Sequence, residues 1–69
     1  MTERYEGRAL SLEEAAVRAV DQIPWREGRD YAVGRVVEWG LQRGGFIDTK
    51  LYYVIVEEDP NADFRTEGP

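Results

Sequence analysis

The sequence predicts a small α+β domain built from a strand, a helix and a long β-hairpin. Three observations lead to this fold class: a helix-capping signal begins at Ser11, two long segments rich in Val, Ile, Tyr and Trp follow it, and Gly44-Gly45 separates these segments. The chain has 69 residues, which suffices for one domain only. We expect residues 1–58 to form this domain and the acidic residues 59–69 to form a flexible C-terminal tail.

The first two elements are expected on either side of Ser11. Residues 4–10 are few and mixed in polarity, and we interpret them as one strand that leads into the helix. Ser11-Leu12-Glu13-Glu14 matches a capping box, in which the Ser hydroxyl accepts from one free backbone amide and Glu14 reaches back to another. Pro24 is expected to end the helix. The apolar side chains of this helix fall on one thin stripe, half of it alanine, that can lie close against a sheet: Leu12, Ala15, Ala16, Ala19, Val20 and Ile23.

Residues 25–30 are polar, contain Gly28 and are predicted to form a loop. Trp25 stands directly after Pro24, and a tryptophan side chain buries a large apolar area when it packs on a core. We therefore expect Trp25 to fold back over the end of the helix.

Residues 31–43 and 46–59 are predicted to be the two long strands of one hairpin, with Gly44-Gly45 as a two-residue turn. In that register Lys50 lies directly opposite Trp39. Strands of this length have to twist and curl, here around the helix. A β-bulge at Gly34 or Gly40 would move part of one strand to the other face.

Both faces of the predicted hairpin contain many apolar side chains, but one Ala-rich helix can cover only one of them. An antiparallel sheet with a solvated side normally alternates apolar and polar residues. The chain contains neither Cys nor His, so disulfides and thiolate or imidazole metal ligands do not supplement its small core. This pattern predicts that a second protomer or a ligand covers the second face, and we expect a homo-oligomer. The alternative is a monomer in which Arg35, Asp48 and Lys50 keep that face solvated.

Composition argues against several functional classes. The net charge is −5 and the Lys and Arg residues are scattered singly among acids, so we expect no nucleic-acid partner. No apolar run approaches the roughly 20 residues that span a bilayer. The first residues also lack the features of a signal peptide, so we expect no membrane partner and a cytoplasmic location. Without Cys or His, and with Ser11 used in the cap, no catalytic or metal site is predicted and we expect a protein that is not an enzyme.

The order of the elements and two short motifs resemble the dodecin family over about residues 4–58. Residues 11–20 are similar to the Ser-x-x-x-Ala-Ala-x-x-Ala-Val start of the dodecin helix, and Val36-Val37-Glu38 resembles part of the middle strand. The resemblance implies a three-stranded antiparallel sheet wrapped around one helix. It further implies that twelve copies assemble into a hollow shell, and that flavin is the candidate ligand, since several dodecins bind it.

The resemblance also implies where a flavin would be held. In dodecins that bind flavin, a Trp on the middle strand stacks on the isoalloxazine ring and a Gln on the last strand forms a hydrogen bond to its edge. An ungapped alignment places Tyr31 and Lys50 at these positions. An alignment on the Val-Val-Glu motif places Val33 and Tyr52 there instead.

One predicted face of the hairpin combines aromatic side chains with a cation. Trp39 and Tyr52 could stack on a planar anionic ligand, and Lys50 could neutralise its charge. The alternative is that these aromatic side chains serve cross-strand packing. The candidate ligand site therefore comprises Tyr31, Trp39, Lys50 and Tyr52.

These observations predict a non-catalytic homo-oligomeric protein of dodecin-like shape that binds or stores a small ligand. The alternative function is a protein-interaction module that offers an apolar sheet face or the edge of its hairpin to an unrelated partner protein. A large mass that does not depend on concentration would favour the first function, and a monomer that becomes structured only beside another protein would favour the second.

Overall fold

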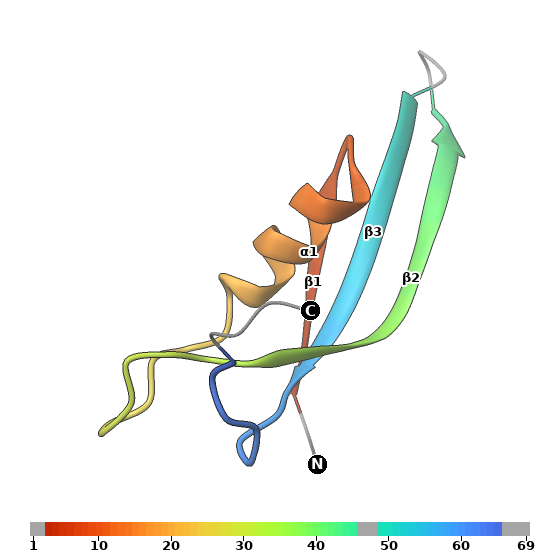
Figure 1. The fold of residues 1–69 in the computed structure, drawn as a ribbon. Coiled ribbons are helices and arrows are strands. Elements are labelled where there is room, and N and C mark those ends of the chain that lie inside the picture. Colours follow the sequence, from red (N-terminus) through yellow and green to blue (C-terminus); the bar gives the residue numbers. More distant parts are fainter. Residues whose placement is uncertain (1–2, 46–48, 66–69) are drawn as a thin grey trace.

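A computed structural model describes residues 3–45 and 49–65 and confirms the predicted order of strand, helix and hairpin. The elements are β1 (Arg4–Ala9), α1 (Leu12–Val20), β2 (Gly34–Gly44) and β3 (Thr49–Glu58). The three strands form one antiparallel sheet in the order β1-β3-β2, and α1 lies on one face of it, against β1 and β3 (Figure 1). No helix in the described part of the chain is long and apolar enough to cross a membrane.

The helix begins where the capping signal predicts. The hydroxyl of Ser11 accepts a hydrogen bond from the backbone amide of Glu14 at 3.1 Å. The second half of the predicted capping box is wrong: the carboxylate of Glu14 accepts from Arg18 at 3.0 Å and does not reach back to a backbone amide. The same guanidinium donates to the carbonyl of Arg8 at 2.9 Å. The regular helix ends at Val20, before the predicted stop at Pro24, but the chain continues in a turn that still buries Ile23.

The helix packs directly on β1 because both surfaces are made of small residues. A Cβ atom placed on Gly7 would lie 2.2 Å from the carbonyl oxygen of Ala15 and 2.5 Å from the backbone nitrogen of Ala19. The side-chain amide of Gln22 donates to the carbonyl of Glu6, which fixes the end of α1 against the same strand. The core that results is small and consists of Ala9, Ala15, Ala19, Ile23, Val54 and Val56.

The predicted register of the hairpin is wrong by four residues. Trp39 lies opposite Val54, and Lys50 lies opposite Arg43. Gly44, predicted as part of the turn, is instead the last residue of β2 and lies opposite Thr49. Residues 46–48, which the prediction assigned to the start of the last strand, lie outside the described residues. Because the error is an even number of residues, the side chains from Glu38 to Gly44 keep their predicted faces.

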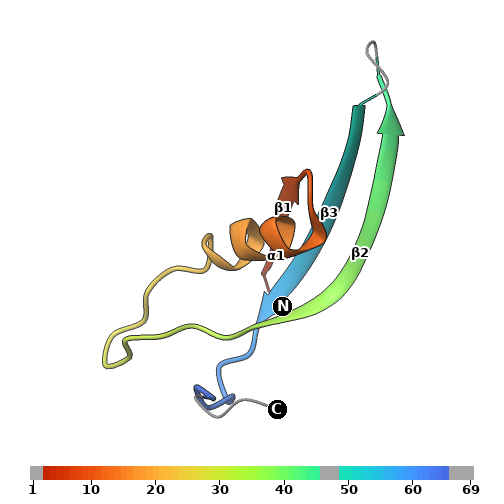
Figure 2. The same cartoon turned by 45° about the horizontal axis from the view of Figure 1, so that its top comes forward.

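A β-bulge interrupts the pairing of β2 with β3 between Val36 and Glu38, whereas the sequence suggested Gly34 or Gly40. One extra residue on the bulged strand reverses the faces beyond it. Val36 therefore joins Trp39 on the face that carries α1, and Arg35 turns to the opposite face. β2 also bends sharply at this end, so that its first residues pass below the helix (Figure 2).

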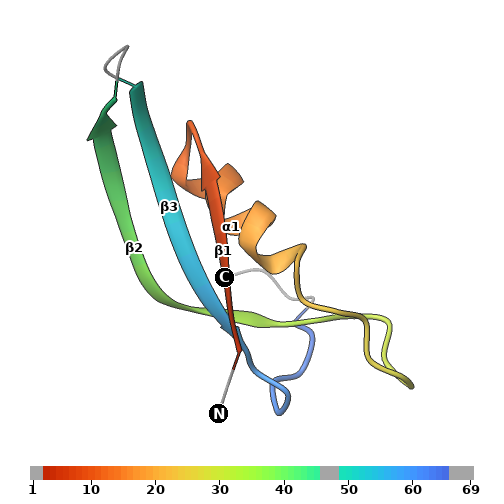
Figure 3. The same ribbon diagram turned by 180° about the vertical axis from the view of Figure 1, so that it is seen from behind.

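Figure 3 shows the ribbon from behind. On the face of the sheet that points away from α1, most side chains are polar. The carboxylate of Glu57 contacts Arg4 at 3.1 Å and Arg35 at 3.5 Å. The ring of Tyr53 lies against Gly40, and its hydroxyl donates to Glu38 at 3.2 Å. The uncovered apolar surface that the sequence predicted is therefore on the helix side of β2, where Val36, Trp39 and Leu41 are exposed.

Trp25 does not cover the core, and the prediction for it is wrong: its side chain is 75% exposed. Arg26, the next residue, makes the contact that fixes this end of the fold. The guanidinium of Arg26 donates to the carboxylate of Glu58 through Nε at 3.1 Å and through Nη2 at 2.5 Å. This pair joins the loop after α1 to the end of β3.

The Arg26–Glu58 pair should make stability depend on pH. Hydrogen bonding and charge from Arg26 hold the pKa of Glu58 below its ordinary value of 4.5. Stability from the pair is therefore fully present above pH 4.5 and is lost as the pH falls through the lowered folded-state pKa.

We expect Glu58→Gln to unfold at a lower urea concentration than the native chain at pH 7 and at the same urea concentration in strong acid. Glu13→Gln, whose side chain points away from the sheet, controls for the loss of one negative charge; equal pH profiles for the native chain and Glu58→Gln would contradict the pair.

Residues 59–65 lie beside the segment that precedes β2. The amide of Asp59 donates to the carbonyl of Val33 at 2.8 Å, and the ring of Phe64 is 5.6 Å from that of Tyr31. Residues 31–33 were predicted as the start of the first hairpin strand. They are not part of β2, which begins at Gly34.

Candidate functional site

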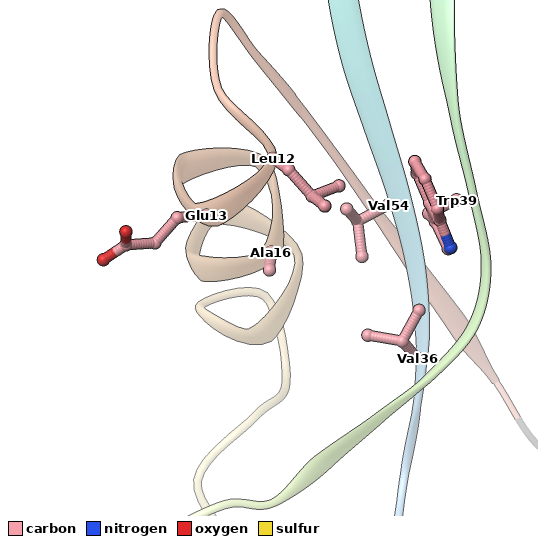
Figure 4. A pocket seen from close by; sticks show the side chains of 6 residues that line it. All are labelled: Leu12, Glu13, Ala16, Val36, Trp39 and Val54. Carbon is pink, nitrogen blue, oxygen red and sulfur yellow. The ribbon is translucent and has the colours of Figure 1, made fainter.

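An apolar groove lies between α1 and β2. Leu12 and Ala16 line it from the helix, Val36 and Trp39 from β2, and Val54 from β3 (Figure 4). Its volume is about 590 Å³. Glu13 stands at the rim, and its carboxylate points away from the sheet, so the described lining is almost entirely hydrocarbon and indole.

The groove exists because the helix is narrow and lies off-centre on the sheet. Contact through Gly7 brings α1 close to β1 and β3, whereas β2 extends past the helix with little contact. Val54 is 1% exposed and forms the floor, while Val36 and Trp39 on β2 are 49% and 58% exposed. Leu41, 54% exposed, continues the apolar surface along the same face of β2. Exposed apolar side chains gathered at one place are typical of sites that contact a partner or a ligand.

The structure brings two of the four predicted site residues to this surface. Trp39 lines the groove, and Tyr52, opposite Leu41 on the same face, is half-buried and packs against the core. Lys50 shares the face but lies opposite Arg43, about 13 Å along the hairpin from the Trp39 pair by strand spacing. The expected juxtaposition of Lys50 and Trp39 is therefore wrong.

Tyr31, the fourth predicted residue, lies outside β2 and away from the groove. Its ring contacts Phe64, and the guanidinium of Arg29 is 5.1 Å from its centroid. These neighbours give Tyr31 a packing role beside the C-terminal segment. Its predicted place on the face with Trp39 depended on an uninterrupted strand, which the bulge at Val37 precludes.

Sequence reasoning missed four residues of the groove: Leu12, Ala16, Val36 and Val54. Leu12 and Ala16 were identified as members of the apolar stripe, but nothing in that stripe distinguishes residues that meet the sheet from residues beside it. Val36 was placed on the opposite face. A signal for its true position would have required locating the bulge.

The described lining of the groove is apolar apart from Glu13 at its rim. The clear pKa shifts lie elsewhere: partial burial and the hydrogen bond with Glu38 raise the pKa of Tyr53 on the outer face, and the hydrogen bond with Glu3 raises that of Tyr5. In the described ranges, no three acidic residues are grouped so that they could hold a metal ion. What the groove offers a ligand is apolar contact and one indole face.

Comparisons with models of protein families, with curated proteins and with solved structures gave no match for this chain.

Proposed function

We propose that this chain is a non-catalytic, self-associating binding protein of dodecin-like shape, and that its groove holds a planar apolar ring system against Trp39. The observation that carries the proposal is the open groove itself, in which an exposed indole stands above a buried apolar floor. A volume of about 590 Å³ falls in the range of small-molecule sites. A flavin is the first candidate ligand.

The charges around the groove favour a ligand with an anionic end on one side. Glu13 at the rim beside α1 disfavours an anion there. Arg43 and Lys50 form a cross-strand pair of cations on the groove face, beyond Leu41. The phosphate of a flavin mononucleotide whose ring stacks on Trp39 would be attracted toward this pair. We therefore expect flavin mononucleotide to bind more tightly than riboflavin, with a difference that shrinks at high salt.

The alternative function, a module that binds an unrelated protein, is favoured by one further feature. β2 lies at the edge of the sheet, and a partner strand could extend the sheet there. The two functions predict different masses for the isolated chain, because a module for a foreign partner has no reason to self-associate.

Replacing Trp39 tests the ligand site. We expect flavin mononucleotide to lose its fluorescence when it binds the native chain, because stacking on an indole quenches it. We expect Trp39→Ala to weaken binding by about 5- to 150-fold, since one stacked base or ring is worth about 1–3 kcal/mol. Trp25→Ala removes another exposed tryptophan, which does not line the groove, and this variant should bind as the native chain does. Equal affinities for the two variants, or no binding by the native chain, would contradict the site.

A further inference from the structure

We infer that two copies of this chain join through the free edges of their β2 strands, in an antiparallel register centred on Gly40, so that their two grooves combine into one trough. The inference rests on the self-association proposed above and specifies its interface. The trough has a floor formed by β2 of both copies and one helix as each wall.

The outer edge of β2 is available for pairing. The strand order β1-β3-β2 leaves this edge without a neighbouring strand among the described residues. The bulge at Val37 disrupts only the beginning of β2, and the seven residues from Glu38 to Gly44 pair regularly with β3. This stretch contains no proline, and a regular edge of this kind is a template for another strand.

Symmetry restricts the registers in which β2 can pair with itself. When two antiparallel strands form one continuous sheet, opposite residues share a face, so a two-fold axis has to pass through one residue position. With the axis at Gly40, Trp39 lies opposite Leu41 of the second copy on the groove face. Glu38 lies opposite Gln42 of the second copy on the outer face. Each contact occurs twice.

Other axis positions match the side chains less well. An axis at Glu38 places two like charges directly opposite each other, which is unfavourable. An axis at Trp39 sets Leu41 against the bulged Val37. An axis at Leu41 provides one Leu–Leu pair instead of two Trp–Leu pairs and places Trp39 opposite Arg43 of the second copy. Of these four registers, only the one centred on Gly40 covers both exposed apolar side chains and also places a carboxylate opposite an amide.

Gly40 is also suited to the axis itself. It has no side chain, and the ring of its own Tyr53 lies against it on the outer face, so close that an added Cβ would be 2.6 Å from the ring. At the axis, the two copies of Gly40 therefore place no side chains beside each other on the outer face.

The second copy completes a site that is only half-walled in one chain. Six strands then form one sheet with both helices on the same face. Strand and helix dimensions place the two helix axes roughly 20 Å apart, which leaves a gap about as wide as an aromatic ring system. Leu12 and Ala16 of each copy face each other across Trp39 and Leu41 of both.

Engineered cysteines test the register, because the native chain contains no Cys. In Glu38→Cys/Gln42→Cys the two thiols of one strand are about 13 Å apart and cannot bond within the chain, but each lies opposite a thiol of the second copy. We expect oxidation to convert most of this variant into a covalent dimer. Glu38→Cys and Gln42→Cys alone are the matched controls, since equal residues of the two copies are again about 13 Å apart, and both should remain largely monomeric on a non-reducing gel.

A charge exchange provides a second readout without cysteine. Gln42→Glu creates two Glu–Glu contacts across the axis and should weaken the dimer roughly tenfold, and Glu38→Lys/Gln42→Glu should restore it. If the native chain self-associates but the double cysteine variant forms no more covalent dimer than the single ones, this register is overturned while the proposed function stands. A monomeric native chain contradicts both.

Discussion

Gly7→Val is expected to lower the free energy of unfolding by about 3 kcal/mol or more. The first side-chain carbon would lie 2.2 Å from a backbone oxygen of α1, whereas ordinary contacts begin near 3.4 Å. The helix would have to move off the sheet by more than 1 Å, and overpacking of a core costs typically about 1–3 kcal/mol even when the neighbours are flexible side chains. Because a chain of this length has only about 3–10 kcal/mol of stability, we expect a largely unfolded variant at 37 °C.

Glu6→Val provides the matched control for this change. It introduces the same side chain one residue earlier on β1, where the side chain is exposed and points away from α1. Its effect should stay below about 1 kcal/mol, the usual limit for loss of an exposed ion pair such as Glu6–Arg8. Urea unfolding followed by circular dichroism at one fixed protein concentration measures both variants. A Gly7→Val midpoint equal to that of Glu6→Val would contradict the close contact between α1 and β1.

Val56→Ala is expected to cost about 2–3 kcal/mol. Val56 lies on the central strand β3, is fully buried, and contributes much of the volume of a core that is otherwise rich in alanine. The loss combines about 0.8 kcal/mol per buried methylene with the cavity that remains. The residue does not line the groove, so ligand binding by the folded variant should be unchanged.

Val17→Ala is the corresponding control, because the same substitution is made on the solvated side of α1. Val17 is 52% exposed, and alanine has the higher helix propensity, so the variant should be as stable as the native chain or slightly more stable. Calorimetry or urea titration separates the two variants. Equal destabilisation by both would show that Val56 is not in the core.

The helix and its packing face were predictable because local residues determine them. Ser11 and Glu14 define the N-terminus within four residues, and the spacing of Ala15 and Ala19 places both on the buried stripe. The same sequence could not place Trp25. Its burial depends on whether the loop folds back, and the Arg26–Glu58 pair instead holds the loop at the end of β3.

The hairpin register was not predictable, because Gly44-Gly45 is consistent with more than one loop length. The bulge is harder still to predict, because Val36-Val37 contains no glycine or proline to mark it. These two features determine the candidate site. The register separates Lys50 from Trp39, and the bulge brings Val36 to the groove. Tyr31 is absent from the groove because β2 begins only at Gly34.

The mass of the untagged chain in solution is the most direct test of the central claim that the surface around Trp39 is covered by further copies of the chain. Light scattering over a wide range of concentrations should give a multiple of 7.9 kDa: about 16 kDa for the dimer through β2, or about 95 kDa if such dimers assemble into a twelve-subunit shell. A mass near 8 kDa at every concentration would contradict the account and would favour a partner of another kind for the groove.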